Sequence, residues 1–234
     1  MIMSEFKYFD FIDSSFDHYF DQISNLFFYP FIGKEFTDSK QKLLIVGESV
    51  YNWESDAARR INAQKQLLSK HFVRKTCIEQ GLKINSDKNY HRFYRNIELM
   101  HFGKKIDKEE RGKFWKSVCF HEFVLEPMQS IIDRPTEMQY VKGAEVLIKI
   151  INLLKIEKVY FLGSEFKKFE TIRNELFKNN FSVETFERKR IGRHFARKRI
   201  IKRENNYSTT IYFVKHPSAF FSAKKWHQFV KEEQ

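Results

Sequence analysis

The sequence predicts an α/β fold, a three-layer αβα sandwich around a mainly parallel central sheet. Three short apolar runs carry this prediction, because strands that are buried on both faces are continuous apolar blocks. Each run stops at a polar cluster, and such clusters converge at the edge of a parallel sheet where ligands bind. The runs are residues 43–46, 159–162 and 211–214, and the clusters are Gly47-Glu48-Ser49, Gly163-Ser164-Glu165 and Lys215-His216-Pro217-Ser218.

Helices are predicted on either side of the first strand. Residues 6–31 are aromatic and acidic, with apolar side chains at mixed helical spacings. We therefore expect a helix that packs on the sheet, within an N-terminal extension of residues 1–40. Residues 55–80 have a helical pattern that ends near Gly81, and a polar connection follows up to His91.

The second half of the chain continues the alternation of strands and helices that is typical of αβα sandwiches. No internal repeat and no linker rich in proline or glycine interrupts it, so residues 1–234 are predicted to form a single domain. The predicted strands are residues 114–124, 159–162, 181–186 and 211–214, and the predicted helices are residues 141–154, 165–179 and 222–231.

Composition indicates a compact protein of the cytoplasm. Phe is abundant (26 residues), whereas Gly (8) and Pro (4) are scarce, which argues against low-complexity sequence. The two cysteines, Cys77 and Cys119, form no CxxC pair, and we expect both to be buried, inert and reduced. There is no secretory signal and no apolar stretch near 18 residues. The eight histidines lack ligand spacing, so we expect no metal, no cofactor, no membrane partner and a monomer.

The net charge of +12 is concentrated in one segment. Residues 188–203 carry nine positive side chains and no acid, which leaves +3 for the rest of the chain. Such a block is typical of a surface that follows a phosphate backbone. A solvated loop, or a patch for anionic lipid or acidic protein, is the alternative. The predicted DNA-binding residues of the run are Arg188, Lys189, Arg190, Arg193, Arg197, Lys198 and Arg199.

Two of the polar clusters resemble signature loops of the uracil-DNA glycosylase superfamily. Gly47-Glu48-Ser49-Val50-Tyr51 follows the first predicted strand, and His216-Pro217-Ser218 follows the last. Residues 114–123 with Arg134-Pro135-Thr136 resemble a less studied branch, and the similarity spans about residues 42–230. Ser49, Val50 and Asn52 depart from the better-known branch, which has Asp, Pro and His there. Ordinary turns between strands and helices are the alternative explanation.

The resemblance implies a uracil-DNA-glycosylase-like domain that acts as a monofunctional DNA glycosylase. Such an enzyme flips out a pyrimidine and hydrolyses its N-glycosidic bond, which leaves an abasic site. Because positive charge develops on the sugar and negative charge on the base, the site needs a carboxylate and a donor. By resemblance, Glu48 positions water, with Ser49 beside it, His216 donates to the base, and Ser218 holds a phosphate. A capping carboxylate and a turn histidine are the structural alternatives for Glu48 and His216.

Base flipping needs a pocket with an aromatic wall and a wedge that fills the gap in the stack. Tyr51 and Trp53 are placed for the wall. Phe220 falls where the resembled loop has its intercalating leucine, and Phe221 beside it could help. The alternative is that Phe220, Phe221 and Trp226 pack the last helix against the sheet.

The identity of the base depends on the strand around residue 120. In the resembled family a side-chain amide there reads uracil, and this chain has Glu122. A carboxylate accepts a hydrogen bond from cytosine N4, which favours a cytosine-type base over uracil. The expected bases include modified cytosines such as those of phage DNA, which suggests a role in phage defence. A shift of one residue in this strand would put His121 in that role.

A different functional class is a catalytically inactive DNA-binding module with the same fold. Ser49, Val50 and Asn52 favour the module, whereas Glu48, His216 and Ser218 favour the enzyme. A nucleotide hydrolase or transferase would need a glycine-rich phosphate loop, which this sequence lacks. An iron–sulfur cluster needs four cysteines, and this sequence has two.

Overall fold

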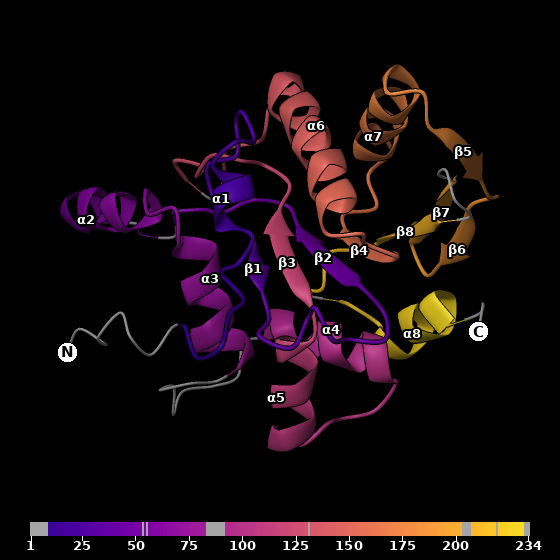
Figure 1. Ribbon diagram of the computed structural model, residues 1–234, viewed down its shortest axis with the longest axis horizontal. Helices are drawn as coiled ribbons and strands as arrows, with labels where there is room; N and C mark the ends of the chain where they lie inside the picture. Colours follow the sequence, from indigo (N-terminus) through magenta and orange to yellow (C-terminus); the bar gives the residue numbers. More distant parts are fainter. Residues whose placement is uncertain are drawn as a thin grey trace.

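The protein is an α/β protein with a mixed, mostly parallel central sheet of eight strands that is flanked by helices (Figure 1). Its structure is a computed structural model that describes residues 9–52, 54, 56–82, 92–130, 132–202, 207–218 and 220–231. The strands occur in the order β1-β3-β2-β4-β8-β7-β5, and β6 pairs with β7. They are β1 (Phe31–Ile32), β2 (Leu43–Gly47), β3 (Cys119–Glu122), β4 (Lys158–Leu162), β5 (Ser182–Thr185), β6 (Lys189–Ile191), β7 (His194–Lys202) and β8 (Ser208–Val214).

The centre of the sheet is parallel and its margins are antiparallel. Strands β3, β2, β4 and β8 run in one direction, so their carboxyl ends lie at the same edge. Strand β1 is antiparallel to β3, and β7 is antiparallel to both β8 and β5. The prediction of strands at residues 43–46, 159–162 and 211–214 is confirmed.

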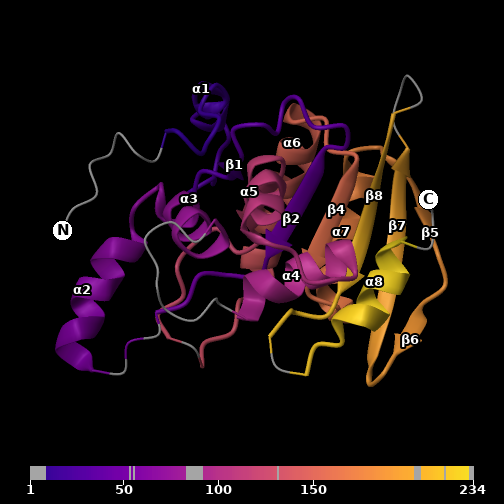
Figure 2. The same cartoon turned by 90° about the horizontal axis from the view of Figure 1, so that it is seen from below.

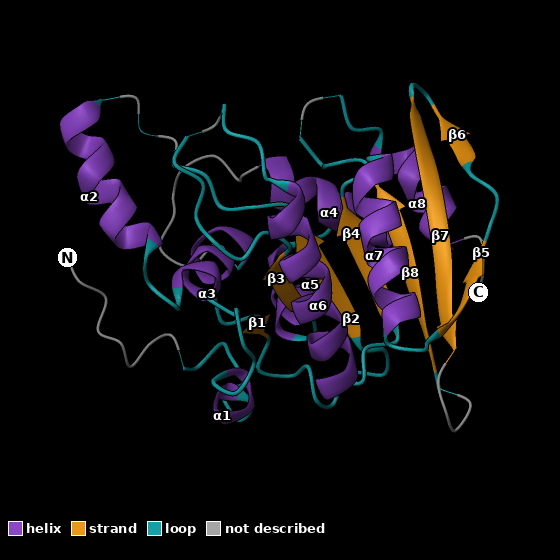
Figure 3. Cartoon of the chain, turned by 90° about the horizontal axis from the view of Figure 1, so that it is seen from above, coloured by secondary structure: helices purple, strands orange, loops and turns teal. Residues whose placement is uncertain are grey.

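Helices cover both faces of the sheet (Figures 1 and 3). Alternate strand residues belong to two separate apolar cores: Leu44 and Phe161 pack with the helix pair α6 and α7, whereas Ile45 and Tyr160 pack on the opposite face with α4, α5 and α8. None of the described helices is long and apolar enough to cross a membrane. The helices that flank the sheet are α4 (Arg92–Phe102), α5 (Lys108–Lys116), α6 (Glu137–Leu153), α7 (Phe166–Lys178) and α8 (Ala223–Lys231).

The N-terminal segment is the largest departure from the predicted elements. Instead of a helix over residues 6–31, the structure has one helical turn, α1 (Asp17–Phe20), followed by a loop in which Asn25 has a positive φ of 68°. Phe28 is nonetheless fully buried. The aromatic residues therefore pack from a loop, which explains why their spacing fits no single helical period.

The long predicted helix of residues 55–80 is divided. Helix α2 (Ala57–Leu67) projects away from the sheet (Figures 2 and 3), and α3 (Phe72–Thr76) continues into a π-helical turn, Cys77–Gly81. The predicted connection up to His91 lies outside the described residues from position 83 onward. The predicted strand of residues 114–124 is also shorter than expected, because a capping box of Asp107 and Glu110 starts α5, which occupies its first residues.

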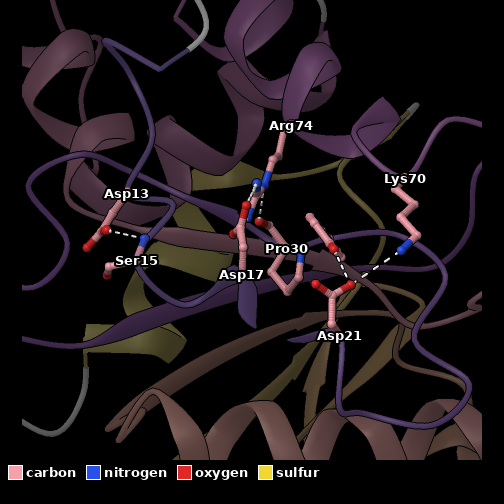
Figure 4. A network of polar contacts seen from close by, with 8 residues as sticks. Asp13, Ser15, Asp17, Asp21, Pro30, Lys70 and Arg74 are labelled. Carbon is pink, nitrogen blue, oxygen red and sulfur yellow. Dashed lines mark hydrogen bonds and ion pairs between the residues drawn. The ribbon is translucent and has the colours of Figure 1, made fainter. Parts of the chain in front are cut away.

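A polar cluster in which each guanidinium nitrogen of Arg74 has a partner connects the N-terminal segment to α3 (Figure 4). Arg74 is buried and donates to both carboxylate oxygens of Asp17, at 2.9 and 2.6 Å, and to the carbonyl oxygen of Pro30 at 2.9 Å. Asp21 accepts from the Tyr29 hydroxyl and from Lys70. We name Asp17 and Arg74 the N-terminal cluster, and its bonds explain how a mostly irregular segment keeps a fixed position.

Candidate active site

The backbone at the carboxyl ends of β2 and β3 is rigidly held. Gly47 pairs with Glu122 at the last position of the parallel ladder. The pairing continues past the strands, because Val124 N donates to Glu48 O at 2.8 Å and Met128 N donates to Val50 O at 2.8 Å. The predicted signature loop is therefore an extension of the sheet, which fixes where the Glu48 side chain starts.

Lys168 of α7 organises the carboxylates at this edge. Its ammonium donates to Glu48 Oε1, and it donates to Glu165 Oε2 at 2.9 Å. The Lys168 side chain is 2% exposed, whereas that of Glu48 is 24% exposed. The two carboxylates raise the pKa of Lys168 against the opposing effect of burial. Glu48 is thus held as an ionised carboxylate with one face toward solvent.

Glycine makes room for two of these groups. A Cβ atom at Gly163 would lie 3.1 Å from Lys168 Nζ, and a Cβ atom at Gly47 would overlap the carboxyl group of Glu122. Gly47 is the last residue of β2, and Gly163 directly follows β4. Their small size lets long ionisable side chains from neighbouring elements cross the ends of β2 and β4.

His216 lies in a loop that α4 supports. Asn96 Nδ2 donates to the carbonyl oxygen of Pro217 at 3.0 Å. The centre of the Phe93 ring is 5.2 Å from that of the His216 ring and 6.2 Å from that of the Phe120 ring. Burial lowers the pKa of His216, although the Glu48 carboxylate opposes this shift. The imidazole is therefore neutral at neutral pH and has one N–H to donate.

Glu122, rather than His121, lies on the side of the sheet that faces α4. Along β3, Phe120 and Glu122 alternate with Cys119 and His121, and Cys119 belongs to the core beneath α6 and α7. His121 is fully buried, and burial lowers its pKa to about 3. Glu122 Oε2 is buried and has no hydrogen-bond partner within the described ranges. Burial, and to a smaller extent the charge of Glu48, raises the pKa of Glu122 to about 8.

The other residues of the loop after β2 differ in their positions. The Ser49 hydroxyl is buried without a hydrogen-bond partner among the described residues. Tyr51 is partly buried and packs against the core beneath α6 and α7. Asn52 is buried and donates to Arg60 O and Gln64 Oε1, both at 3.1 Å, so it holds the start of α2. Trp53 lies outside the described residues.

Phe220 differs sharply from the neighbouring aromatic residue. Its side chain is 98% exposed, and its φ of 56° lies in the left-handed region that favours glycine. Lys215 Nζ lies 6.0 Å from the centre of its ring, and Ser218 in the same loop is also exposed. Phe221, by contrast, stacks on Trp226 with ring centres 6.1 Å apart, so it packs α8 instead of helping a wedge.

The basic run forms a β-hairpin, although the sequence predicts a connection between two strands there. The register of β7 against β8 pairs Arg197 with Phe213, which places the start of β7 beside Lys215 and His216. Figure 2 shows the β6–β7 hairpin and the loop between β8 and α8 at the same end of the sheet. Arg188, Lys189, Arg190 and Arg193 are exposed there, and we name these four residues the hairpin cations.

Three of the predicted DNA-binding residues are buried, and the prediction of a surface role is wrong for them. Arg197 donates to Ser164 O at 2.6 Å, Lys198 lies 3.8 Å from the centre of the Phe186 ring, and Arg199 lies over Phe169 and pairs with Glu170. Burial lowers the pKa of Arg199 to about 10. These side chains anchor the hairpin to α7 and to the end of β4.

Lys168 and Glu165 are the main functional candidates that sequence reasoning missed. The cluster Gly163-Ser164-Glu165 after β4 was the available signal, since Lys168 follows Glu165 by three residues, about one helical turn. Among the described residues, no group of three His, Cys, Asp or Glu side chains is placed to hold a metal ion. Models of known protein families give no match to this chain, and curated protein sequences give none either.

Proposed function

We propose that the protein is a monofunctional DNA glycosylase with a domain like that of uracil-DNA glycosylases. One observation carries the proposal: a single edge of the sheet brings together an ionised carboxylate, Glu48, a neutral histidine, His216, and an exposed aromatic side chain, Phe220. The hairpin cations lie beside that edge. This combination suits an enzyme that grips a phosphate backbone, displaces a base and cleaves the bond that holds it.

The chemistry follows from the charges that develop as the N-glycosidic bond breaks. The bonding electron pair leaves with the base while positive charge develops on the sugar, which the Glu48 carboxylate stabilises. Glu48 also orients the water that adds to C1′, and the neutral imidazole of His216 donates a hydrogen bond to the departing base. Lys168 is a charged ammonium shared by two carboxylates. It is thus unsuited to attack C1′ as an amine, which favours simple hydrolysis to an abasic site.

DNA binding and base displacement involve the exposed loop and hairpin. Phe220 occupies the space that a displaced base leaves in the stack, as apolar wedges do in other proteins that unstack DNA. Ser218 and the hairpin cations bind phosphates on either side. Glu122 faces the base on the α4 side, and a cytosine-type pyrimidine is the proposed substrate class.

Base release is the direct test of this proposal. Duplexes that contain uracil, cytosine, hydroxymethylcytosine or glucosylated hydroxymethylcytosine are incubated with the protein, and free base is measured by mass spectrometry together with alkali-labile sites. We expect release of one base, reduced about 10²- to 10⁴-fold by Glu48→Gln and by His216→Ala. Glu126→Gln, which changes an exposed glutamate after β3, is the matched control and should retain activity. Absence of release from every duplex would contradict the proposal.

An inactive DNA-binding module is the second candidate, because Asn52 is engaged in holding α2 and Ser49 replaces an acid. Both candidates predict that Arg190→Ala with Arg193→Ala weakens binding equally for all sequences and lowers the salt slope by about one for each phosphate that the protein no longer neutralises. The control is Lys105→Ala with Lys108→Ala, two exposed residues after the far end of α4. The module is the better explanation if binding shows this pattern without base release.

A further inference from the structure

Glu122 is the carboxyl group of the site that has no counter-charge. Its Oε2 atom is buried and accepts no hydrogen bond from the described residues, and the ion pairs that these residues form at the site do not include it. The buried ammonium of the site, Lys168, is already bound by Glu48 and Glu165. A buried carboxylate without a partner is costly, and the usual response is to take up a proton.

Glu122 also lies beside a second, ionised carboxylate. Its partner in the parallel ladder is Gly47, the residue directly before Glu48, and its carboxyl group fills the space that a side chain at position 47 would need. The charge of Glu48 acts on Glu122, and two interacting carboxyl groups do not both ionise easily. Lys168 fixes which of them keeps the negative charge. Among the described residues, Glu48 and the buried thiol of Cys77 are the titratable groups that interact with Glu122.

We propose that Glu122 is the acid that protonates the departing base, while Glu48 acts as the ionised carboxylate on the sugar side. This assignment rests on the proposed glycosylase function. It matches the general pattern in which two neighbouring carboxyl groups in different environments divide the acid and base roles. The raised pKa of Glu122, about 8, agrees with a group that still carries its proton at neutral pH.

The step balances with water as the only co-reactant. The bond between C1′ and the pyrimidine N1 breaks, and its electron pair leaves with the base, which takes the Glu122 proton at O2 or N3. The water oxygen bonds to C1′, and the proton that it loses goes to Glu48. Transfer of that proton through solvent from Glu48 to Glu122 restores both groups.

This role favours a pyrimidine that carries an exocyclic amine. The cytosine anion is more basic than the uracil anion, so cytosine leaves poorly unless it is protonated. A neutral carboxyl group also fits the edge of cytosine, because its O–H donates to N3 and its carbonyl oxygen accepts from N4. Glu122 thus both donates and accepts a hydrogen bond, whereas the sequence alone predicts an ionised carboxylate that only accepts.

The test compares Glu122→Gln with wild type on cytosine-type and uracil duplexes across pH. We expect release of the cytosine-type base to fall about 100-fold and the loss of wild-type activity above pH about 8 to disappear from the profile. Release of uracil, the better leaving group, should fall less than about tenfold. Equal losses on both bases with an unchanged profile would overturn the assignment and leave Glu122 a structural role. Glu126→Gln is the control.

A second measurement is independent of activity. Carbon-13 NMR of glutamate carboxyl groups in the full-length protein should show one signal that titrates near pH 8, and that signal should be absent from Glu122→Gln. If no glutamate titrates above pH about 7, the proposed acid role is wrong even if the enzyme is active. If the signal is present and no duplex releases a base, the glycosylase proposal has failed while the proton on Glu122 has been found.

Discussion

Two polar clusters in this protein are built around a buried cation, and they differ in whether the surrounding polar atoms are satisfied. In the N-terminal cluster, Arg74 uses three donors, two on Asp17 and one on Pro30 O. At the sheet edge, Lys168 binds two carboxylates, but Glu122 Oε2 and both ring nitrogens of His121 are buried and have no hydrogen-bond partner in the described part of the chain. A cluster whose polar atoms have partners stabilises a fold, whereas unpaired buried groups at the carboxyl ends of parallel strands, where ligands bind in such sheets, are candidates for a site that a ligand completes.

The largest loss of stability is expected from breaking the N-terminal cluster. Asp17→Asn leaves the Arg74 guanidinium, which is 2% exposed, without its counter-charge. Loss of one partner of a buried pair costs about 3 kcal/mol, or about 6 to 12 °C in Tm for a chain of this size. Urea unfolding measures the loss, and base release per folded molecule should not change.

Asp21→Asn is the matched control for this substitution. Asp21 and Lys70 form an ion pair in which both side chains are more than half exposed. Exposed pairs contribute little because solvent screens them. A loss of stability as large as that of Asp17→Asn would show that the N-terminal segment depends on overall charge and not on the buried guanidinium.

At the sheet edge, around Lys168, we expect the opposite: a substitution should reduce activity and leave stability nearly unchanged. Lys168→Met removes the ammonium, but Glu48 and Glu165 reach solvent, so no charge is left buried, and the free energy of unfolding should change by less than about 1 kcal/mol. Base release should fall on the order of 100-fold, because Glu48 loses the group that orients it. Lys168→Arg should restore part of the activity, since it keeps the charge.

Lys167→Met is the control, because Lys167 is the adjacent residue on α7 and forms an exposed pair with Glu137. It should affect neither stability nor base release. If Lys168→Met unfolds the protein as readily as Asp17→Asn does, the distinction between the two clusters is wrong.

The central sheet could be predicted from the sequence because its strands are buried on both faces. Residues 43–46, 159–162 and 211–214 are short apolar blocks with no competing helical period. The hairpin of β6 and β7 was not predicted, because nine positive side chains interrupt the apolar pattern by which strands are recognised. Arg197, Lys198 and Arg199 are adjacent strand residues that are all buried. Tertiary contacts with aromatic rings, with Ser164 O and with Glu170 compensate for their burial.

The candidate site was predictable only in part. Glu48 and His216 follow strands, and the sheet brings their loops to one edge. Lys168 was not predictable from spacing alone, because its role depends on how α7 packs over the end of β4. The environment of Glu122 was equally hidden, since its unpaired state depends on which carboxylates already bind the nearby lysine.

The dependence of stability on pH tests the unpaired state of His121. The pKa of His121 falls from its ordinary 6.5 to about 3 on folding, so the unfolded chain binds a proton that the folded chain excludes between these values. Stability is therefore lost as pH falls through this range, by at most about 1.4 kcal/mol per pH unit for one group. His121→Leu should flatten that dependence in urea unfolding between pH 7 and 5.

His101 supplies the internal comparison for this experiment. Its pKa is lowered to about 4, but its ring lies 3.1 Å from the Tyr160 hydroxyl and is thus satisfied. His121→Leu should also raise stability at neutral pH by about 1 kcal/mol, because it removes unpaired buried polar atoms. His101→Leu should give no such gain, as it leaves the Tyr160 hydroxyl without its partner. Equal gains from both substitutions would contradict the importance of hydrogen-bond satisfaction.

The smallest expected effect separates stability from function at Phe220. The other described non-glycine residues with positive φ are two asparagines and a lysine. Phe220 is an exposed aromatic residue, and its exposed side chain makes little contribution to packing that would offset the cost of a positive φ. Phe220→Gly should stabilise the protein by about 1 kcal/mol, because glycine adopts this conformation without strain.

The same change should slow base release from duplex DNA and leave release from single strands unaffected, since a wedge is needed only where bases are stacked. Phe220→Leu should retain the duplex activity without the gain in stability. If Phe220→Gly is neutral for duplex release, the exposed ring does not act as the wedge.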